Sequence, residues 1–402
     1  MDKRREELYD QMEELRCVDQ NTATEKSIKK IKRKIKKDKY NMSLTKSALF
    51  NTKGLFTKSV NFAAGGVFTS SGKVSGPSGP PALSDIVSTY FSTTTPTFIN
   101  DIAIDSNLNI YLLDRYHIIW KLNSSLTFTQ FAGSNSGYLD ATGTSAQFGD
   151  DMKAITIDPS GNIFVSDTNN NCIRKITPGG VVTTVAGTKG TNGNTGGQPG
   201  TSQITSPVVA MTSDTAGNIY FINNISPVNV TLCKIDTANN MTILNGAGTA
   251  GQNNGAISGA QFLSFSQYMK CDKNNNLYLI ENTTGGGATY YIRKISLSTS
   301  TVTTLFSTST PISSLVPDSY GNLFIGSRTN NIIYKLDTSL NFSAFAGTGA
   351  PSTLNGPGAS AQFNFSSSNP QFGPGITVDS NNKIYITEQT TGPNNTNIRL
   401  IS

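Results

Sequence analysis

The sequence has few of the residues that build metal and disulfide sites. Its 402 residues include one histidine, His117, and four cysteines. The cysteines are Cys17, Cys172, Cys233 and Cys271. A zinc site built on histidines cannot form around one histidine, and the cysteines are too far apart for a Cys-x-x-Cys pair. We therefore expect neither a zinc site nor a disulfide framework.

Long apolar segments are also missing. No run approaches the roughly 18 apolar residues of a membrane-spanning helix. The start of the chain, Met1–Glu7, is charged and lacks the apolar stretch of a signal peptide. These features predict an intracellular protein, cytoplasmic or nuclear, that no signal peptide exports and that has no transmembrane segment.

Charge is scarce and unevenly placed. Charged residues make up 14% of the chain and hydrophobic residues 36%. The remainder is rich in Gly, Ser, Thr and Asn, which favour turns and short strands, so an all-β body is expected. Residues 1–58 contain 16 Lys and Arg against 9 Asp and Glu, whereas the remaining residues contain 16 against 17. The positive charge therefore belongs to an N-terminal arm.

One short turn pattern recurs six times, most clearly as Asp-x-x-Gly-Asn. The copies are residues 105–109, 158–162, 214–218, 272–276, 318–322 and 379–383. Asp accepts backbone hydrogen bonds in such a turn, and Gly or Asn adopts the positive φ that it requires. Apolar β-formers flank each copy, which predicts a hairpin. Repetition of this length is typical of propellers and solenoids.

Each hairpin is followed by two further strands. The third ends in a basic and an aliphatic residue, as in Arg174-Lys-Ile176, and the fourth ends in Ala-Gly, as in Val185-Ala-Gly187. Four short antiparallel strands make one propeller blade, so six blades are predicted. The sixth unit ends after its third strand. Residues 60–66 resemble the fourth strand at 340–347, and we expect them to close the ring as an N-terminal clasp strand.

These motifs resemble NHL repeats over residues 59–402, with the best copy at 153–187. The inter-blade segments that contain Gln147-Phe148 and Gln362-Phe363 fit the same pattern. The resemblance implies a six-bladed β-propeller. Insertions at 224–229 and 283–289 set the third and fourth blades apart.

Candidate catalytic residues are few. Propeller lyases and lactonases resemble one another in needing several His or carboxylate ligands in the central channel. His117 is interpreted as a packed or solvent-edge side chain, and Asp150 with Asp151, near Asp140, as a solvated turn. The turn aspartates could ligate calcium, but their recurrence has a local structural reason. We predict no catalytic residue, no metal ligand and no cofactor.

Basic residues of the third strands suggest an RNA-binding ring, since some NHL propellers bind RNA on one face. They are Lys121, Arg174, Lys175, Lys234, Arg293, Lys294, Lys335 and Arg399. The more economical interpretation is that they pair with the turn aspartates between neighbouring strands. A nearly neutral body is also not the basic surface that a phosphate backbone prefers.

The N-terminal arm, residues 1–40, is predicted to be helical. Leu8, Met12 and Leu15 form one apolar stripe that could mediate self-association. Its basic segment, 26–39, has one acid and nine basic residues, and residues 41–58 form a linker. The basic residues are Lys26, Lys29, Lys30, Lys32, Arg33, Lys34, Lys36, Lys37 and Lys39. Such a helix suits a nucleic acid, an anionic surface or an acidic protein.

Together these features predict a non-catalytic binding or scaffold protein. The propeller would present one face to a protein partner, and the arm would anchor it to a polyanion or partner. The Asn-, Ile- and Lys-rich composition suits an AT-rich genome, such as that of a large DNA virus with this chain as a virion component. The alternatives are a lactonase- or lyase-type enzyme with a carboxylate-held metal in the channel, and an RNA-binding NHL propeller. Convergence of three repeat-breaking acids or amides at a channel mouth would favour the enzyme.

Overall fold

A computed structural model describes most of the chain after residue 46. The described ranges are 47–50, 56–60, 67–68, 74–75, 86–95, 98–225, 229–245, 250–264, 266–283, 288–365, 374–389 and 396–402. The chain divides into two compact units, Met1–Pro80 and Pro81–Ser402. The predicted arm, 1–40, lies outside the described residues, as do positions 61–66 of the predicted clasp.

The first unit contains two short hairpins. β1 (Ser47–Phe50) pairs antiparallel with β2 (Phe56–Val60), and β3 (Val67–Phe68) pairs antiparallel with β4 (Val74–Ser75). The compact unit with the ring begins at Pro81, whereas the sequence analysis began the propeller at residue 59.

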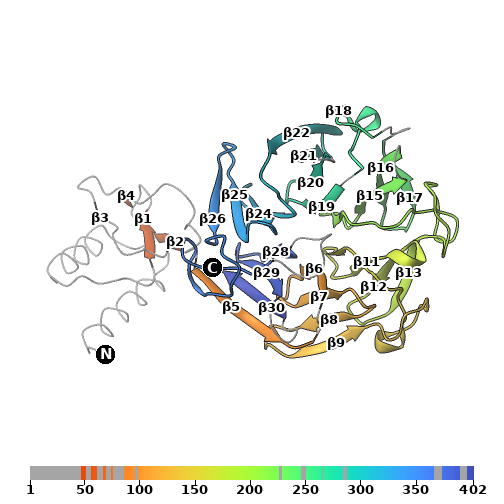
Figure 1. The fold of residues 1–402 in the computed structure, drawn as a ribbon, viewed down its shortest axis with the longest axis horizontal. Coiled ribbons are helices and arrows are strands. Elements are labelled where there is room, and N and C mark those ends of the chain that lie inside the picture. Colours follow the sequence, from red (N-terminus) through yellow and green to blue (C-terminus); the bar gives the residue numbers. More distant parts are fainter. Residues whose placement is uncertain are drawn as a thin grey trace, which may run out of the picture. The chain divides into compact units, whose positions relative to one another are not determined.

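The second unit is a ring of six antiparallel sheets, which confirms the predicted six-bladed propeller (Figure 1). Blade one contains β6 (Ile99–Ile104), β7 (Ile110–Asp114), β8 (Ile119–Leu122) and β9 (Phe128–Ala132). Blade two contains β10 (Ile155–Ile157), β11 (Ile163–Asp167), β12 (Cys172–Ile176) and β13 (Val182–Gly187). Blade three contains β14 (Met211–Ser213), β15 (Ile219–Ile225), β16 (Asn229–Ile235) and β17 (Met241–Ile243).

The other three blades follow the same order. Blade four contains β19 (Ser266–Cys271), β20 (Asn276–Asn282), β21 (Tyr290–Ser296) and β22 (Thr301–Thr308), with β18 (Gly255–Ala256) beside β22. Blade five contains β23 (Ser314–Pro317), β24 (Leu323–Ser327), β25 (Ile332–Leu336) and β26 (Phe342–Ala346). Blade six contains β28 (Ile376–Val378), β29 (Ile384–Gln389), β30 (Thr396–Ile401), β5 (Ile86–Thr93) and β27 (Gly356–Pro357). Short 3₁₀ helices are η1 (Gly143–Ser145), η2 (Thr168–Asn170) and η3 (Ile257–Gly259).

Blade six joins the two ends of the ring. Its three chain-terminal strands pair in order, and β5 takes the fourth position by pairing antiparallel with β30. This is the position that the sequence analysis assigned to residues 60–66. β5 lacks the Ala-Gly ending seen in β9, β13 and β26, which is why the pattern did not identify it. The innermost strands of neighbouring blades contact one another all round, including β28 with β6.

The repeated turns have the predicted chemistry. In blade two, Oδ1 of Asp158 accepts hydrogen bonds from the backbone N–H groups of Ser160 and Asn162, each at 2.9 Å. Gly161 has φ of +79°. In blade one the equivalent position is Leu108, at φ +63°, a conformation that is costly for a residue with a Cβ.

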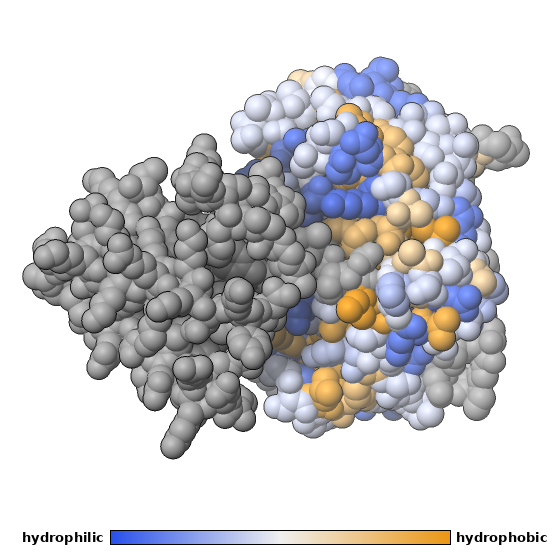
Figure 2. Space-filling model, turned by 90° about the vertical axis from the view of Figure 1, so that its left-hand side faces the viewer, coloured by the Kyte–Doolittle hydropathy of each residue, from blue (hydrophilic) through white to orange (hydrophobic). Residues whose placement is uncertain are grey.

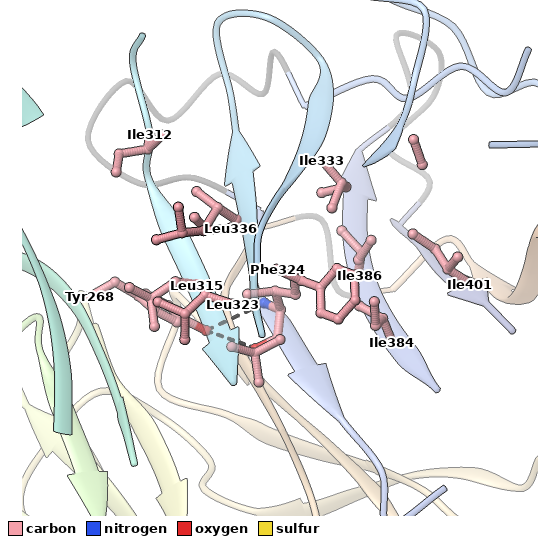
Figure 3. Close-up of a cluster of buried hydrophobic side chains, with 14 of the residues drawn as sticks. Tyr268, Ile312, Leu315, Leu323, Phe324, Ile333, Leu336, Ile384, Ile386 and Ile401 are labelled. Atoms are coloured by element: carbon pink, nitrogen blue, oxygen red, sulfur yellow. Dashed lines mark hydrogen bonds between the residues drawn. The ribbon is translucent and has the colours of Figure 1, made fainter. Parts of the chain in front are cut away.

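The hydrophobic core is divided into layers between adjacent blades. Second strands such as β7 are buried throughout because both of their faces pack against a neighbour. Ile110 and Leu112 pack towards blade six, and Tyr111 and Leu113 pack towards blade two. Figure 3 shows the layer to which blades five and six contribute, with Tyr268 entering it from blade four. On the side drawn in Figure 2, surface hydrophobic residues form separate patches between hydrophilic ones.

Candidate functional site

The central channel is crossed by a cluster of three polar side chains that depart from the repeat. Asp101 lies on the inner strand of blade one, and Tyr268 and Lys270 lie on the inner strand of blade four. Blades one and four are opposite each other in a six-membered ring. The hydroxyl of Tyr268 donates to Oδ1 of Asp101 at 2.7 Å, and Nζ of Lys270 lies 3.9 Å from Oδ2 of Asp101.

Tyr268 also reaches blade six. Its hydroxyl bonds to the carbonyl of Ile376 at 3.1 Å and accepts from the N–H of Ile376 at 3.3 Å (Figure 3). The positions that correspond to Tyr268 in blades two, three, five and six hold Ala154, Ala210, Ser314 and Gly375. All four of these residues are small, and 8% of Tyr268 is exposed.

Asp101 is fully engaged by this cluster and the adjacent backbone. Its Oδ1 accepts from the N–H of Ile102 at 2.8 Å, and its Oδ2 accepts from the N–H of Ile155 at 3.1 Å. Burial and the nearby Asp101 carboxylate raise the pKa of Tyr268 well above its usual value, so the phenol stays protonated and donates. The arrangement links blades one, two, four and six, and each carboxylate oxygen of Asp101 accepts at least one hydrogen bond.

Four of the repeated turn aspartates line a cavity of about 300 Å³ beside the inner strands. They are Asp105, Asp158, Asp214 and Asp272. Each is used by its own hairpin: Oδ2 of Asp214, for example, accepts from the side chains of Asn218 and Tyr220 at 2.7 and 3.2 Å. The recurrence of these aspartates therefore follows from local structure, as the sequence indicated.

The third-strand arginines were assigned the wrong partners from sequence. Arg174 pairs with Asp167 at 2.7 Å, Arg293 with Glu281 at 2.9 Å and Arg399 with Glu388 at 2.7 Å. Each acid lies at or near the end of the second strand, across the sheet from its arginine. The turn aspartates are at the other end of that strand, out of reach. All three arginine side chains are 0% exposed, so they cannot contact RNA.

Each arginine also holds the connection that enters its blade. In blade six, Arg399 donates to the carbonyls of Gln362 and Leu354 and to Oδ1 of Asn355 at 3.0–3.1 Å. The hydroxyl of Thr89 on β5 donates to the same Oδ1 at 3.2 Å. Blades two and four repeat this arrangement, which we call the arginine clamp. Its other members are Gln147, Leu139, Asp140 and Thr184, and Gln261, Asn253, Asn254 and Thr304.

The clamp alternates with a different arrangement around the ring. Blades one, three and five hold Trp120, Cys233 and Tyr334 at the arginine position. The sequence contained a pattern that could have predicted which blades have the clamp. An acid at the end of the second strand and an Asp or Asn in the entering loop accompany each arginine. The basic residue that follows has another role, since Nζ of Lys121 and Nζ of Lys175 lie 5.4 and 5.7 Å from aromatic ring centres.

The candidate acid–base residues are divided between separate contacts. Nδ1 of His117 lies 2.8 Å from Oδ1 of Asp150, and half of the Asp150 side chain is exposed. Asp151 pairs with Arg115 at 3.5 Å and with Lys153. Asp140 belongs to the Arg174 clamp. Asp150 and Asp151 thus contact different partners and do not act together as a carboxylate pair.

Within the described ranges, no group of three His, Cys, Asp or Glu side chains could hold a metal ion. No helix in those ranges is long and apolar enough to cross a membrane. The nine basic residues of the arm lie outside the described part of the chain.

Comparison with known proteins identifies the repeat. Residues 154–176, in blade two, match the NHL repeat model. No curated protein matches the sequence. Among solved structures, an auxiliary nutrient-binding protein from Bacteroides thetaiotaomicron is 14% identical with a TM-score of 0.52, covering 79% of this chain and 76% of its own. An auxiliary nutrient-binding protein from Bacteroides ovatus is 12% identical with a TM-score of 0.52, and the match covers 79% of this chain and 76% of that protein.

Virginiamycin B lyase from Staphylococcus aureus is 13% identical with a TM-score of 0.44, covering 78% of this chain and 87% of its own. At these identities the two Bacteroides structures show a shared fold and nothing about activity.

Proposed function

Since the chain is a six-bladed β-propeller of the NHL-repeat family, we propose that it is a non-catalytic binding or scaffold protein. The cluster across the channel carries this proposal. Propeller enzymes of the lactonase and lyase type would need free carboxylates there, whereas Asp101 is paired with Tyr268, Lys270 and two backbone N–H groups. Its oxygens are therefore committed to holding blades together.

The partner-binding face is the one opposite the repeated Asp turns. The turn face is nearly uniform, because in every blade the repeated aspartate accepts hydrogen bonds within its own hairpin. The opposite face carries the links between second and third strands, which differ in length from blade to blade. β15 with β16 and β20 with β21 form longer hairpins there than the strands of blade two. A protein partner is recognised by this variation, since loops on a rigid scaffold are where binding residues concentrate.

The N-terminal arm is the second binding element that we propose. Its nine basic residues anchor the propeller to a polyanion, with attachment to the nucleic acid or surface of a virus particle as one setting. An acidic protein is the other candidate for the same segment. The nearly neutral body makes the arm the main source of electrostatic attraction.

The arm is tested with the full chain and a full-length variant in which the nine basic residues are replaced by Gln. Binding to DNA, RNA and anionic vesicles is measured across a salt series. We expect the full chain to bind with an affinity that falls steeply with salt, by a log–log slope of about −0.9 for each phosphate contacted on duplex DNA. The variant should lose this binding. Equal binding by both proteins would overturn the anchor, and binding by neither would assign the arm to a protein partner.

The non-catalytic assignment has its own test. The full chain is incubated with γ- and δ-lactones, with and without calcium, magnesium or zinc. We expect no turnover above that of buffer containing the metal. Turnover that requires added metal and is lost in Asp101→Asn would overturn the proposal, because it would show that this carboxylate serves a reaction.

A further inference from the structure

Four asparagines of the chain are followed directly by a glycine: Asn192, Asn245, Asn254 and Asn355. An Asn-Gly pair is the sequence most prone to spontaneous deamidation, because a glycine lacks the side chain that would keep its backbone nitrogen away from the asparagine amide. Two of the four, Asn254 and Asn355, belong to arginine clamps. The clamp of blade two has Asp140 at the same position. The three clamps therefore hold either an amide or a carboxylate at one equivalent place.

In blade six the clamp fixes both groups that take part in deamidation. Oδ1 of Asn355 accepts from Nη2 of Arg399 at 3.0 Å and from the hydroxyl of Thr89 at 3.2 Å. The next residue, Gly356, lies in β27 and pairs with Val87 of β5. Asn355 is exposed, so water is at hand. What limits the reaction is therefore the freedom of the side-chain amide and of the glycine backbone.

Blade four holds its Asn-Gly pair in the same way. Oδ1 of Asn254 accepts from Nη2 of Arg293 at 3.1 Å and from the hydroxyl of Thr304 at 3.3 Å. Gly255 lies in β18 and pairs with Val302 of β22 at the outer edge of the blade (Figure 1). Asn254 and Gly255 are both exposed. The same four contacts thus restrain two Asn-Gly pairs on different blades.

Asn192, in the connection that enters blade three, has no arginine clamp. Its Oδ1 accepts from Nδ2 of Asn171 at 2.6 Å, and Gly193 lies outside the strands of blade three. Asn192 is also exposed. It therefore serves as the reference for an Asn-Gly pair that no arginine holds.

We propose that Asn254 and Asn355 are sites of spontaneous deamidation that the arginine clamp controls. When a clamp opens, the backbone nitrogen of the glycine attacks Cγ of the asparagine. The side-chain nitrogen leaves as ammonia with the proton of the glycine N–H, and a cyclic imide remains. Water then opens one of the two imide carbonyls and gives aspartate or isoaspartate. This inference concerns the chemistry of the ring itself, so it goes beyond the proposed function and does not depend on it.

The two products have opposite effects on a blade. Aspartate supplies the carboxylate that blade two already has, where Oδ1 of Asp140 lies 2.6 Å from Nη2 of Arg174 and Oδ2 accepts from the N–H of Thr184 at 3.0 Å. Isoaspartate adds one methylene to the backbone immediately before β18 or β27, which disturbs the register of that strand. Deamidation therefore either adds an ion pair to the clamp or removes the cover of an outer strand.

The test follows each Asn-Gly pair of the full chain by peptide mapping with mass spectrometry during incubation at mildly alkaline pH. Two variants, Thr89→Val and Thr304→Val, each remove one clamp hydroxyl at an exposed position and leave the buried ion pairs intact. We expect Thr89→Val to accelerate deamidation of Asn355 about two- to tenfold, the change in opening that one hydrogen bond supplies, and to leave Asn254 unchanged. Thr304→Val should do the reverse, so each variant is the control of the other.

Two comparisons in the unaltered chain complete the test. Asn192 should deamidate faster than Asn254 and Asn355, and unfolding in guanidinium chloride should remove this difference. Equal rates at the three sites of the folded chain would overturn the proposal, as would variants that change both clamped sites alike or neither of them. Slower deamidation in the variants would overturn it as well, because it would show that the donors activate the amide.

Discussion

Replacing Tyr268 by Phe removes one oxygen atom from the centre of the ring. The hydroxyl donates to Asp101 and also bonds with the carbonyl and the N–H of Ile376. Asp101 and Ile376 are 3% and 0% exposed, so water cannot replace the lost partner. A buried polar group left without a partner costs about 1–3 kcal/mol, and more when it is charged. Asp101 is charged, which raises the expected cost, but it keeps two backbone donors, which limits it. We therefore expect the free energy of unfolding to fall by about 3 kcal/mol, the upper end of this range.

The assay is equilibrium unfolding of the full chain in urea, with the midpoints of variants compared at equal slope. Tyr278→Phe is the matched control from the same blade. Its hydroxyl lies 3.1 Å from Asp272, which keeps a second donor in Asn276, so a loss under about 1 kcal/mol is expected. Asp101→Asn combined with Tyr268→Phe should cost less than the sum of the single changes, because both act on one cluster. A Tyr268→Phe loss no larger than that of the control would refute a structural role for the cross-channel contact.

Three further predictions concern individual blades. Arg399→Met should destabilise the closing blade by about 3–5 kcal/mol, because it leaves Glu388 buried without its cation. The melting temperature of this variant is compared with that of Lys335→Met as a control, and equal decreases in the two variants would contradict the prediction. Leu108→Asn should stabilise the chain by up to about 1 kcal/mol in urea by relieving a left-handed Leu, and a lower midpoint would argue against strain there. Burial raises the pKa of Glu281 from 4.5 to about 7, so the folded chain holds a proton there that the unfolded chain releases. Stability should therefore fall as pH rises from about 5 to 8, and Glu281→Gln should flatten this dependence when midpoints are compared across pH.

Two features of the ring show where sequence patterns gave incomplete information. The fourth strand of blade six is β5, which has no Ala-Gly ending, so its place could be found only from its pairing with β30. The partners of Arg174 were also misassigned. Basic residues and turn aspartates recur together in the sequence, but they lie at opposite ends of the second strand. The acid within reach, Asp167, recurs in fewer blades and gave a weaker signal.

The sequence alone determined the number of blades, the strand order within each and the role of the turn aspartates. Those features depend on contacts between residues close together in the chain, and such contacts leave a periodic signature. Only the tertiary structure placed Tyr268 beside Asp101, because those residues are 167 positions apart and meet across the ring. It also decided that β18 and β27 cover the outer strands of blades four and six, since those pairings join residues far apart in the chain.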